Sequence, residues 1–135
     1  MLEKAKAVCL SAHQGQVDKC GQPYYLHSFA VADMVEGEDA KVVAYLHDVV
    51  EDTPVTIDDL AGMGFPPRIT DAVEAMTRRD DEPYFEYIKR LGGNELARTV
   101  KLADLTHNTD PARDGATQEM RERYAKAKEM LQSLN

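Results

Sequence analysis

Apolar residues recur at helical spacing along nearly the whole chain. In the first segment, the intervals between Leu2, Ala5, Val8, Cys9 and Ala12 place these side chains on one face of a helix. The sequence shows no strand-like alternation of apolar and polar residues, no internal repeat and no interdomain linker. The pattern therefore predicts an all-α fold in which residues 1–135 form a single compact domain of about seven or eight helices.

Turn residues divide this pattern into segments. Glycines mark a loop over residues 15–25. Residues 39–52 are predicted to form one central helix, because the run VVAYLHDVV has almost no polar face, and Pro54 ends it. Thr56 and Asp59 have the spacing of a capping arrangement at the start of a short helix. Further helices are predicted over residues 29–37, 66–77, 82–93, 94–108 and 117–135.

The composition narrows the classes of partner. Of the 135 residues, 43% are hydrophobic and 30% are charged, as in an ordinary globular domain, and the formal net charge is −8. This charge argues against a broad basic surface for duplex nucleic acid. The net charge does not exclude a phosphorylated small molecule as a ligand, because a bound metal ion can reverse the sign of the electrostatic potential in a pocket. The paired charges of residues 117–135 predict a solvated helix face.

No targeting or membrane segment is recognisable. The N-terminus is charged from its third residue, and no window approaches the roughly 18 consecutive apolar residues of a membrane span. Cys9 and Cys20 do not form a CxxC pair, which is typical of reduced cytosolic thiols. We therefore predict a cytoplasmic protein that does not bind membranes. The oligomeric state stays open, because the C-terminal helix could pack on its own core or on a partner chain.

The stretch AYLHDVVEDT, residues 44–53, places a histidine and three carboxylates in an otherwise apolar helix. Unpaired charges in an apolar setting are costly, so something must compensate them, and a bound metal ion would also do chemistry. On a helix, His47 lies one turn before Glu51, and Asp48 lies one turn before Asp52. His47 and Asp48 can therefore bind a metal ion, while the turn that carries Glu51 and Asp52 faces the group that the metal activates.

One helix cannot complete the coordination of a metal ion, so other segments must supply ligands. His27 and Asp104 lie in further apolar helices, where packing alone requires neither residue type. With His47 and Asp48 they give two imidazoles and two carboxylates, a set that suits manganese, iron, zinc or a magnesium-like octahedral site better than a thiolate zinc site. A lone buried histidine is more often a hydrogen-bonded core residue, and a lone buried aspartate is more often a cap or half of an ion pair. The four residues together are harder to explain in this way, so from their spacing alone a metal site and ordinary core roles remain equal alternatives.

Four motifs in a fixed order resemble those of a known family. AHQGQ, GQPYYLHSFAVA, AYLHDVVEDT and VKLADLTHN are similar to the motifs of the HD-domain metal-dependent phosphohydrolases, and the resemblance covers roughly residues 5–112. Within that family, the chain most resembles the hydrolase domain of RelA/SpoT-type enzymes and their small stand-alone relatives. The resemblance implies a single HD-type helical domain that depends on manganese. It also implies a nucleotide substrate, with removal of the 3′-pyrophosphate of guanosine tetraphosphate (ppGpp) as the candidate reaction.

The resemblance also implies roles for individual residues. The acidic pair of the family, which handles the nucleophilic water, matches Glu51 and Asp52, with Glu51 orienting or deprotonating the water and Asp52 as its partner or proton relay. A nucleotide-contacting asparagine matches Asn108. The metal ligands of the family match His27, His47, Asp48 and Asp104.

Further substrate contacts are predicted from chemistry alone. Phosphate groups need positioning and charge stabilisation, and Lys19 and Lys101 are candidate cations, although each is also explained as a surface lysine. Tyr24 could stack on a base or ribose, or simply pack its own loop. His13 and His107 are predicted to be packing or hydrogen-bonding residues.

The chain departs from the family pattern outside the catalytic motifs. Asp18 stands where the alarmone hydrolases usually carry arginine, Leu105 stands where they favour arginine, and residues 109–114 read TDPARD. The sequence therefore predicts the reaction type better than the substrate. The alternatives are hydrolysis of another nucleotide or phosphorylated metabolite, a non-catalytic nucleotide-sensing module, and a purely structural metal site. The presence of all four ligand positions and both acids favours catalysis over a non-catalytic module, and a structural metal site would not need Glu51 and Asp52.

Overall fold

The computed structural model describes residues 1–110 and 117–134 of the chain. These residues form nine helices and no strand, apart from one isolated bridge between Val17 and Pro23, which confirms the all-α prediction. The helices are α1 (Leu2–Ala12), α2 (Tyr25–Met34), α3 (Glu38–Leu46), α4 (Val49–Asp52), α5 (Ile57–Gly62), α6 (Pro67–Ala75), α7 (Tyr84–Leu91), α8 (Glu95–Asn108) and α9 (Gln118–Gln132).

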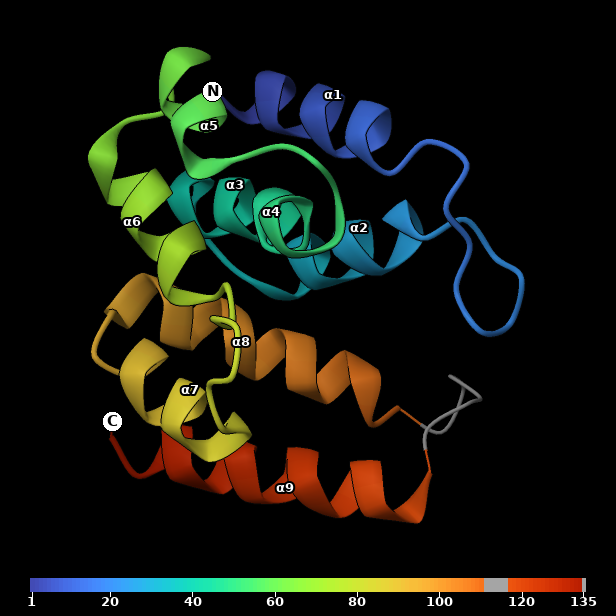
Figure 1. Cartoon of the computed structure of the whole chain (residues 1–135), viewed down its shortest axis with the longest axis vertical. Coiled ribbons are helices and arrows are strands. Elements are labelled where there is room, and N and C mark those ends of the chain that lie inside the picture. Colours follow the sequence, from blue (N-terminus) through green and yellow to red (C-terminus); the bar gives the residue numbers. More distant parts are fainter. Residues whose placement is uncertain (111–116, 135) are drawn as a thin grey trace.

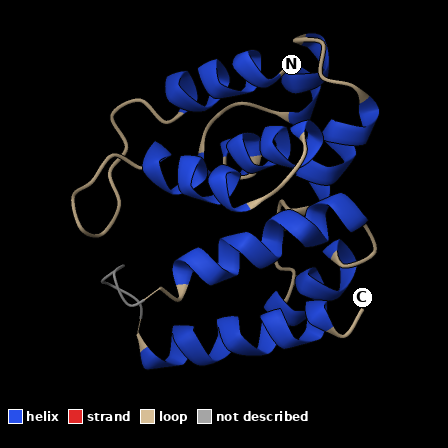
Figure 2. Cartoon of the chain, turned by 180° about the vertical axis from the view of Figure 1, so that it is seen from behind, coloured by secondary structure: helices blue, strands red, loops and turns tan. Residues whose placement is uncertain are grey.

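Helix α8 lies between two groups of helices. Figure 1 shows α1 to α6 on one side of it and α7 and α9 on the other, and Figure 2 shows the same arrangement from behind. The larger core surrounds α3, in which every residue from Val42 to Leu46 is buried. Helix α8 contributes Val100 to this core and Leu105 to the smaller core that α7 and α9 form. Because α8 belongs to both cores, its polar side chains reach the space where the two groups meet.

The central segment differs from the predicted single helix over residues 39–52. Helix α3 ends at Leu46, and α4 begins at Val49. The backbone of His47 and Asp48 stays in the right-handed helical region, with φ of −61° and −100°. The interruption coincides with a side-chain contact: His47 Nδ1 lies 2.6 Å from the carbonyl oxygen of Ala44, the acceptor that a continuing helix would offer to the amide of Asp48. The prediction of one uninterrupted helix was wrong.

Several helix boundaries follow from local sequence signals. The side chain of Thr56 accepts a hydrogen bond from the amide of Asp59, and the Asp59 carboxylate accepts one from the amide of Thr56, both at 3.0 Å. This reciprocal pair confirms the predicted capping arrangement of α5. Pro67 occupies the first turn of α6, where its missing N–H costs nothing, and the side chain of Asn94 caps α8.

The C-terminal helix packs on its own chain. Ala127 and Leu131 of α9 are fully buried in the smaller core with residues of α7 and α8. The predicted solvated face is therefore only the side of α9 that points away from this core. Within the described residues, no helix has both the length and the apolar character needed to cross a bilayer.

The two cysteines lie in different surroundings and do not form a disulfide bond with each other. Cys9 is fully buried in α1, whereas Cys20 is exposed in the following loop. Burial raises the pKa of the Cys9 thiol to about 11, so this residue behaves as a small apolar core residue.

The loop between α6 and α7, residues 77–83, is held in place by an ion pair. Arg90 donates hydrogen bonds to both carboxylate oxygens of Glu82, from Nε at 2.8 Å and from Nη2 at 2.9 Å. Arg90 Nη2 also donates to the carbonyl of Thr77, and the amide of Arg79 donates to Glu82 Oε1 at 3.1 Å. The loop includes Asp81 in the left-handed region, with φ of 59°. These bonds fix the loop although much of it is exposed.

We expect the stabilisation from Glu82 to depend on pH. The hydrogen bonds from Arg90 lower the pKa of Glu82 to about 2, from an ordinary value of 4.5. Because the folded-state pKa is depressed, this stabilisation is fully present above about pH 4.5 and is lost as the pH falls towards 2. Urea unfolding of the wild type and of Glu82→Gln should therefore give a difference in unfolding free energy that is larger at pH 6 than at pH 3. An equal difference at both pH values would contradict this account.

Candidate active site

The four predicted metal ligands converge from three parts of the chain. His27 comes from α2, His47 and Asp48 come from the turn between α3 and α4, and Asp104 comes from α8. Asp104 Oδ1 lies 2.6 Å from His27 Nε2 and 3.3 Å from His47 Nε2. Asp48 Oδ2 lies 3.1 Å from His47 Nε2 and 3.8 Å from His27 Nε2. Residues that are 77 positions apart in the sequence therefore meet at one point.

This cluster fits a divalent cation. A metal ion bound at 2.0–2.2 Å holds neighbouring ligand atoms about 3 Å apart, close to the separations of these nitrogen and oxygen atoms. The ligand atoms of His27, His47 and Asp104 all lie within 4.8 Å of one another, and the three residues are buried. Two imidazoles and two carboxylates form a mixed set that leaves coordination positions for water or substrate in an octahedral site.

Neighbouring side chains stabilise the ionised form of Asp104. Burial raises the pKa of this carboxyl, but Lys101 and the hydrogen bonds from His27 and His47 outweigh it, so that its pKa lies well below the usual range. Lys101 Nζ lies 2.9 Å from Asp104 Oδ2, and Asn108 Nδ2 donates to Asp104 Oδ1 at 3.3 Å. Asp104 is therefore ionised, as a metal ligand must be.

Hydrogen bonds set the orientation of both predicted histidine ligands. Since His47 Nδ1 donates to the carbonyl of Ala44, its Nε2 is left to bind a metal. His27 Nδ1 lies 2.7 Å from His107 Nδ1, and the two rings stack with centroids 4.9 Å apart. His107, predicted to be a packing or hydrogen-bonding residue, is thus positioned to orient His27.

Replacing His107 with alanine is expected to weaken metal binding by about 10- to 100-fold, because His27 would lose the partner of its Nδ1. Titration of metal-free protein with Mn²⁺ in a calorimeter measures this affinity directly. His107→Asn, whose amide oxygen can replace the ring nitrogen as an acceptor, should recover part of the loss. Unchanged affinity in the alanine variant would show that His107 does not orient the ligand.

The acidic pair lies on α4, next to the cluster. The Tyr24 hydroxyl lies 3.2 Å from Asp48 Oδ2 and 3.0 Å from Asp52 Oδ2, so it links a predicted ligand to a predicted catalytic acid. Glu51 Oε2 lies 3.5 Å from the backbone amide nitrogen of Arg78. Partial burial, together with the charge of Asp48, raises the pKa of both Glu51 and Asp52. Raised values bring these carboxyls closer to the range in which they exchange protons near neutral pH.

Tyr24 and its loop are supported from α1. The ring of His13 lies 5.1 Å from the ring of Tyr24, and His13 Nδ1 lies 2.9 Å from Gln16 Oε1. Gln16 Nε2 in turn donates to the backbone carbonyl of Asp52 at 3.0 Å. His13 is buried and does not belong to the group formed by His27, His47 and Asp104.

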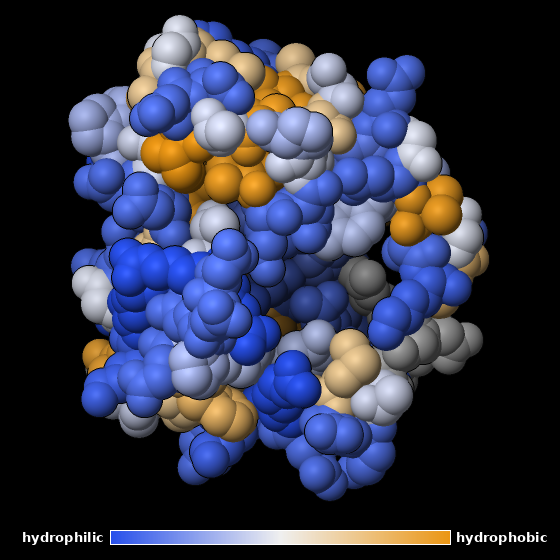
Figure 3. All heavy atoms as spheres, viewed as in Figure 1, coloured by the Kyte–Doolittle hydropathy of each residue, from blue (hydrophilic) through white to orange (hydrophobic). Residues whose placement is uncertain are grey.

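A polar cavity of about 290 Å³ joins these groups. Figure 3 shows the hydrophilic hollow that opens on this face between the two groups of helices. Nine of the ten predicted site residues line the cavity; Lys19 does not. The cavity is lined by Tyr24, His27, His47, Asp48, Glu51, Asp52, Met76, Arg78, Tyr84, Tyr87, Lys101, Asp104, Asn108, Arg123 and Tyr124.

The structure places Lys19 elsewhere. Its side chain is exposed, and its ammonium nitrogen lies 3.9 Å from Met120 Sδ on α9. The prediction that Lys19 faces the pocket is therefore corrected: Lys19 lies in the loop between α1 and α2 and is not part of the cavity lining, although Tyr24 at the end of the same loop is.

The cavity contains basic residues that the sequence analysis did not predict. Arg78 comes from the loop after α6, and Arg123 comes from α9. Neither belongs to one of the four motifs, and Arg123 lies in a segment interpreted as solvated. The only local signal is that Arg123 and Tyr124 lie one turn before the buried Ala127, on the same face of α9, which does not by itself identify a cavity.

The departures from the family pattern have structural roles. Asp18 Oδ1 accepts hydrogen bonds from the amides of Cys20 and Gln22, at 2.8 and 3.0 Å, so this carboxylate stabilises its own loop. Leu105 is fully buried in the smaller core. From residue 111 onward, the TDPARD segment lies outside the described residues. Neither Asp18 nor Leu105 lines the cavity.

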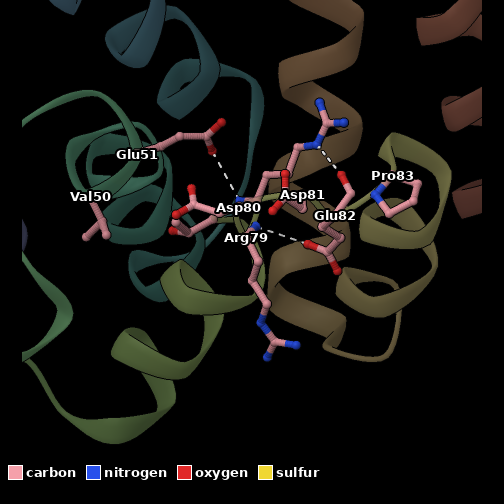
Figure 4. Close-up of a pocket in the computed structure, with 9 residues that line it drawn as sticks. Val50, Glu51, Arg79, Asp80, Asp81, Glu82 and Pro83 are labelled. Carbon is pink, nitrogen blue, oxygen red and sulfur yellow. Dashed lines mark hydrogen bonds between the residues drawn. The ribbon is translucent and has the colours of Figure 1, made fainter.

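A second, larger cavity of about 680 Å³ adjoins the first and shares Glu51 and Arg78 with it. Figure 4 shows that Glu51 and Val50 lie on one side and the loop from Arg79 to Pro83 on the other. A ligand larger than the first cavity can therefore extend past Glu51 along this loop.

Comparison with known proteins identifies relatives of one kind. No protein-family model matches the chain. The bifunctional (p)ppGpp synthase/hydrolase SpoT of Escherichia coli K12 is 32% identical over 122 residues, which cover 79% of this chain and 17% of that protein. The GTP pyrophosphokinase rsh of Brucella melitensis is 34% identical over 123 residues, 80% of this chain and 16% of that protein. The chain thus spans about a sixth of the length of these curated relatives.

A solved structure shows the same fold. The structure of a metazoan ortholog of SpoT, described as hydrolysing ppGpp, matches with a TM-score of 0.77 and 25% sequence identity. The match covers 99% of this chain and 86% of the other. Sequence and fold together confirm the resemblance seen in the four motifs: the chain is a member of the HD-type hydrolases related to SpoT.

Proposed function

We propose that this chain is a metal-dependent phosphohydrolase that acts on a nucleotide, with the 3′-pyrophosphate of guanosine 3′,5′-bis(diphosphate) as its first candidate target. The observation that carries the proposal is the convergence of His27, His47, Asp48 and Asp104 beside the acidic pair of α4, in one polar cavity. The names of the relatives, which refer to (p)ppGpp hydrolysis or to its synthesis, support the same substrate class.

The bound cation is proposed to be manganese, held by the two imidazoles and two carboxylates. Such a cation supplies Lewis acidity, which acidifies water and neutralises charge on phosphoryl oxygens. A purely structural site would be closed and would not need two acids with raised pKa values beside it.

The residues of the chain then have separate tasks. Glu51 accepts a proton from the attacking water, whose oxygen forms the new bond to phosphorus while the bond from phosphorus to the nucleotide oxygen breaks. Asp52, held by the Tyr24 hydroxyl, relays a proton towards the departing oxygen. Lys101 keeps Asp104 ionised, and Asn108 offers its remaining amide groups to the nucleotide.

A nucleotide panel tests the proposal. Protein stripped of metal and reloaded with Mn²⁺, Mg²⁺, Zn²⁺ or Fe²⁺ should release pyrophosphate or phosphate from at least one nucleotide, and chelation should abolish the release. The panel should contain guanosine 3′,5′-bis(diphosphate), nucleoside monophosphates and dinucleotide phosphates. Several nucleotides are needed because Asp18 and Leu105 replace the arginines of the family pattern, so the contacts to base and ribose differ from that pattern. Release from none of them, with any metal, would overturn the proposal in favour of a non-catalytic module.

A further inference from the structure

We propose that Gln16 is a positioning residue for the proposed catalytic acid Asp52. The side-chain amide of Gln16 holds the backbone of Asp52, and the backbone of Gln16 holds the tyrosine that contacts the Asp52 carboxylate. The inference deepens the proposed function and rests on it for the role of Asp52. It gives a task to the AHQGQ motif, which contributes no residue to the lining of the cavity at the metal cluster.

Helix α4, which carries the acidic pair, needs support from outside itself. It has only four residues, and a single helical turn is unstable alone because its first hydrogen bond requires several residues to be fixed at once. Asp52 is its last residue, and the backbone becomes extended at Thr53, with φ of −136° and ψ of 169°. The carbonyl of Asp52 therefore has no amide donor within α4, and its position depends on contacts from other segments.

Gln16 supplies such a contact from 36 positions away in the sequence. Its Nε2 donates to the carbonyl oxygen of Asp52 at 3.0 Å, and its Oε1 lies 2.9 Å from Nδ1 of the buried His13. Rotation of the amide by 180° would turn Oε1 towards the carbonyl oxygen, where two acceptors would face each other. The two contacts therefore fix one orientation of the Gln16 amide, with its donor on Asp52.

The same residue also supports the Asp52 carboxylate, through Tyr24. The amide of Tyr24 donates to the backbone carbonyl of Gln16 at 2.9 Å, and the Tyr24 hydroxyl lies 3.0 Å from Asp52 Oδ2. With the bond from Gln16 Nε2, these contacts form a closed ring that restrains both the backbone and the carboxylate of Asp52. Loss of the Gln16 amide opens this ring at the backbone of Asp52, so that the carboxylate is no longer held in one position.

A cycle of variants tests whether Gln16 acts through Asp52. In Mn²⁺-loaded protein, with the nucleotide that the wild type hydrolyses fastest, Gln16→Met should lower kcat about 10- to 100-fold, because a displacement of about 1 Å near the reacting atoms has effects of this size. KM and the Kd for Mn²⁺ should stay unchanged. In the Asp52→Asn background, Gln16→Met should have little further effect on kcat, since residues that act as a unit give non-additive losses. Gln14→Met, an exposed position of the same motif, is the matched control and should keep the wild-type kcat.

Hydrogen exchange gives a second readout, which needs no activity. The amides of Asp52 and Thr53 donate to carbonyl oxygens one turn earlier, at 2.9 and 3.1 Å, so they exchange only when this turn opens. Gln16→Met should speed their exchange about 2- to 10-fold, the effect of losing one hydrogen bond. Mass spectrometry of peptides that contain residues 49–53 measures these rates, and Gln14→Met should exchange at the wild-type rate.

The outcomes separate this inference from the proposed function. Unchanged exchange in Gln16→Met, an unchanged kcat, or losses that multiply in the double variant with Asp52→Asn each overturn the positioning role, even if the wild type hydrolyses nucleotides. Faster exchange in Gln16→Met but not in Gln14→Met supports the hold of Gln16 on Asp52 even if no nucleotide is hydrolysed, in which case only the catalytic proposal fails.

Discussion

The Glu51→Gln, Asp52→Asn variant is expected to lose about 10²- to 10⁴-fold in kcat, while it keeps its metal. Both carboxylates lie beside the cluster without belonging to the ligand set, and both have raised pKa values. Their amides retain the shape of the side chains but cannot accept a proton from water. The loss should therefore appear in the chemical step rather than in metal binding.

Two measurements check this expectation. Steady-state release of phosphate or pyrophosphate gives kcat, and elemental analysis gives the metal content of the same preparation. Asp58→Asn, which changes an exposed acid on the neighbouring α5, is a matched control and should leave both unchanged. Equal rates in the wild type and the double variant would show that the acidic pair does not take part in catalysis.

Asp104→Ala is expected to abolish stoichiometric metal binding and to destabilise the fold. Asp104 Oδ1 is the atom that lies closest to both histidine ligands, at 2.6 and 3.3 Å, so its removal opens the centre of the cluster. The same change leaves the half-buried Lys101 ammonium without its carboxylate, and breaking a fully buried pair in this way costs about 3–5 kcal/mol, which is the upper bound here. Elemental analysis and urea unfolding measure the two effects separately.

A second variant distinguishes loss of metal from loss of folding. In Lys101→Met, Asp104→Ala the unpaired charge is gone, and a methionine side chain can pack against Tyr87, whose ring Lys101 now contacts at 5.4 Å. This variant should regain most of the unfolding free energy of the metal-free wild type and still bind no metal. Full metal occupancy in either variant would mean that Asp104 is not a ligand.

The convergence of the proposed metal-binding and catalytic residues in one cavity was largely predictable, because each residue carries a local signal. An apolar helical segment contains four polar residues, His47, Asp48, Glu51 and Asp52. The spacing of one helical turn between the two pairs is kept across the short break between α3 and α4. The break itself was not predictable, since it depends on the hydrogen bond of His47 to Ala44.

The basic residues of the cavity lining were predicted poorly. Lys19 was selected because it is a cation near a motif, yet it lies outside the lining, and Arg123 was dismissed as part of a solvated face although it lines the cavity. A lysine or arginine on the surface of a helix looks the same in sequence whether it faces solvent or a cleft. Only the packing of that helix decides between the two.

The sequence alone determined the helical class, the capping of α5 and the residues able to hold a metal, because periodicity, caps and ligand chemistry depend on residue types at short separations. The tertiary structure decided which cations share the cavity with those ligands. The reason is that α8 packs against both groups of helices, which brings Asp104 to His27 and His47 and brings α9 with Arg123 to the opposite side of α8 from α3. Such contacts depend on how whole helices pack and not on the residues near each one in the chain.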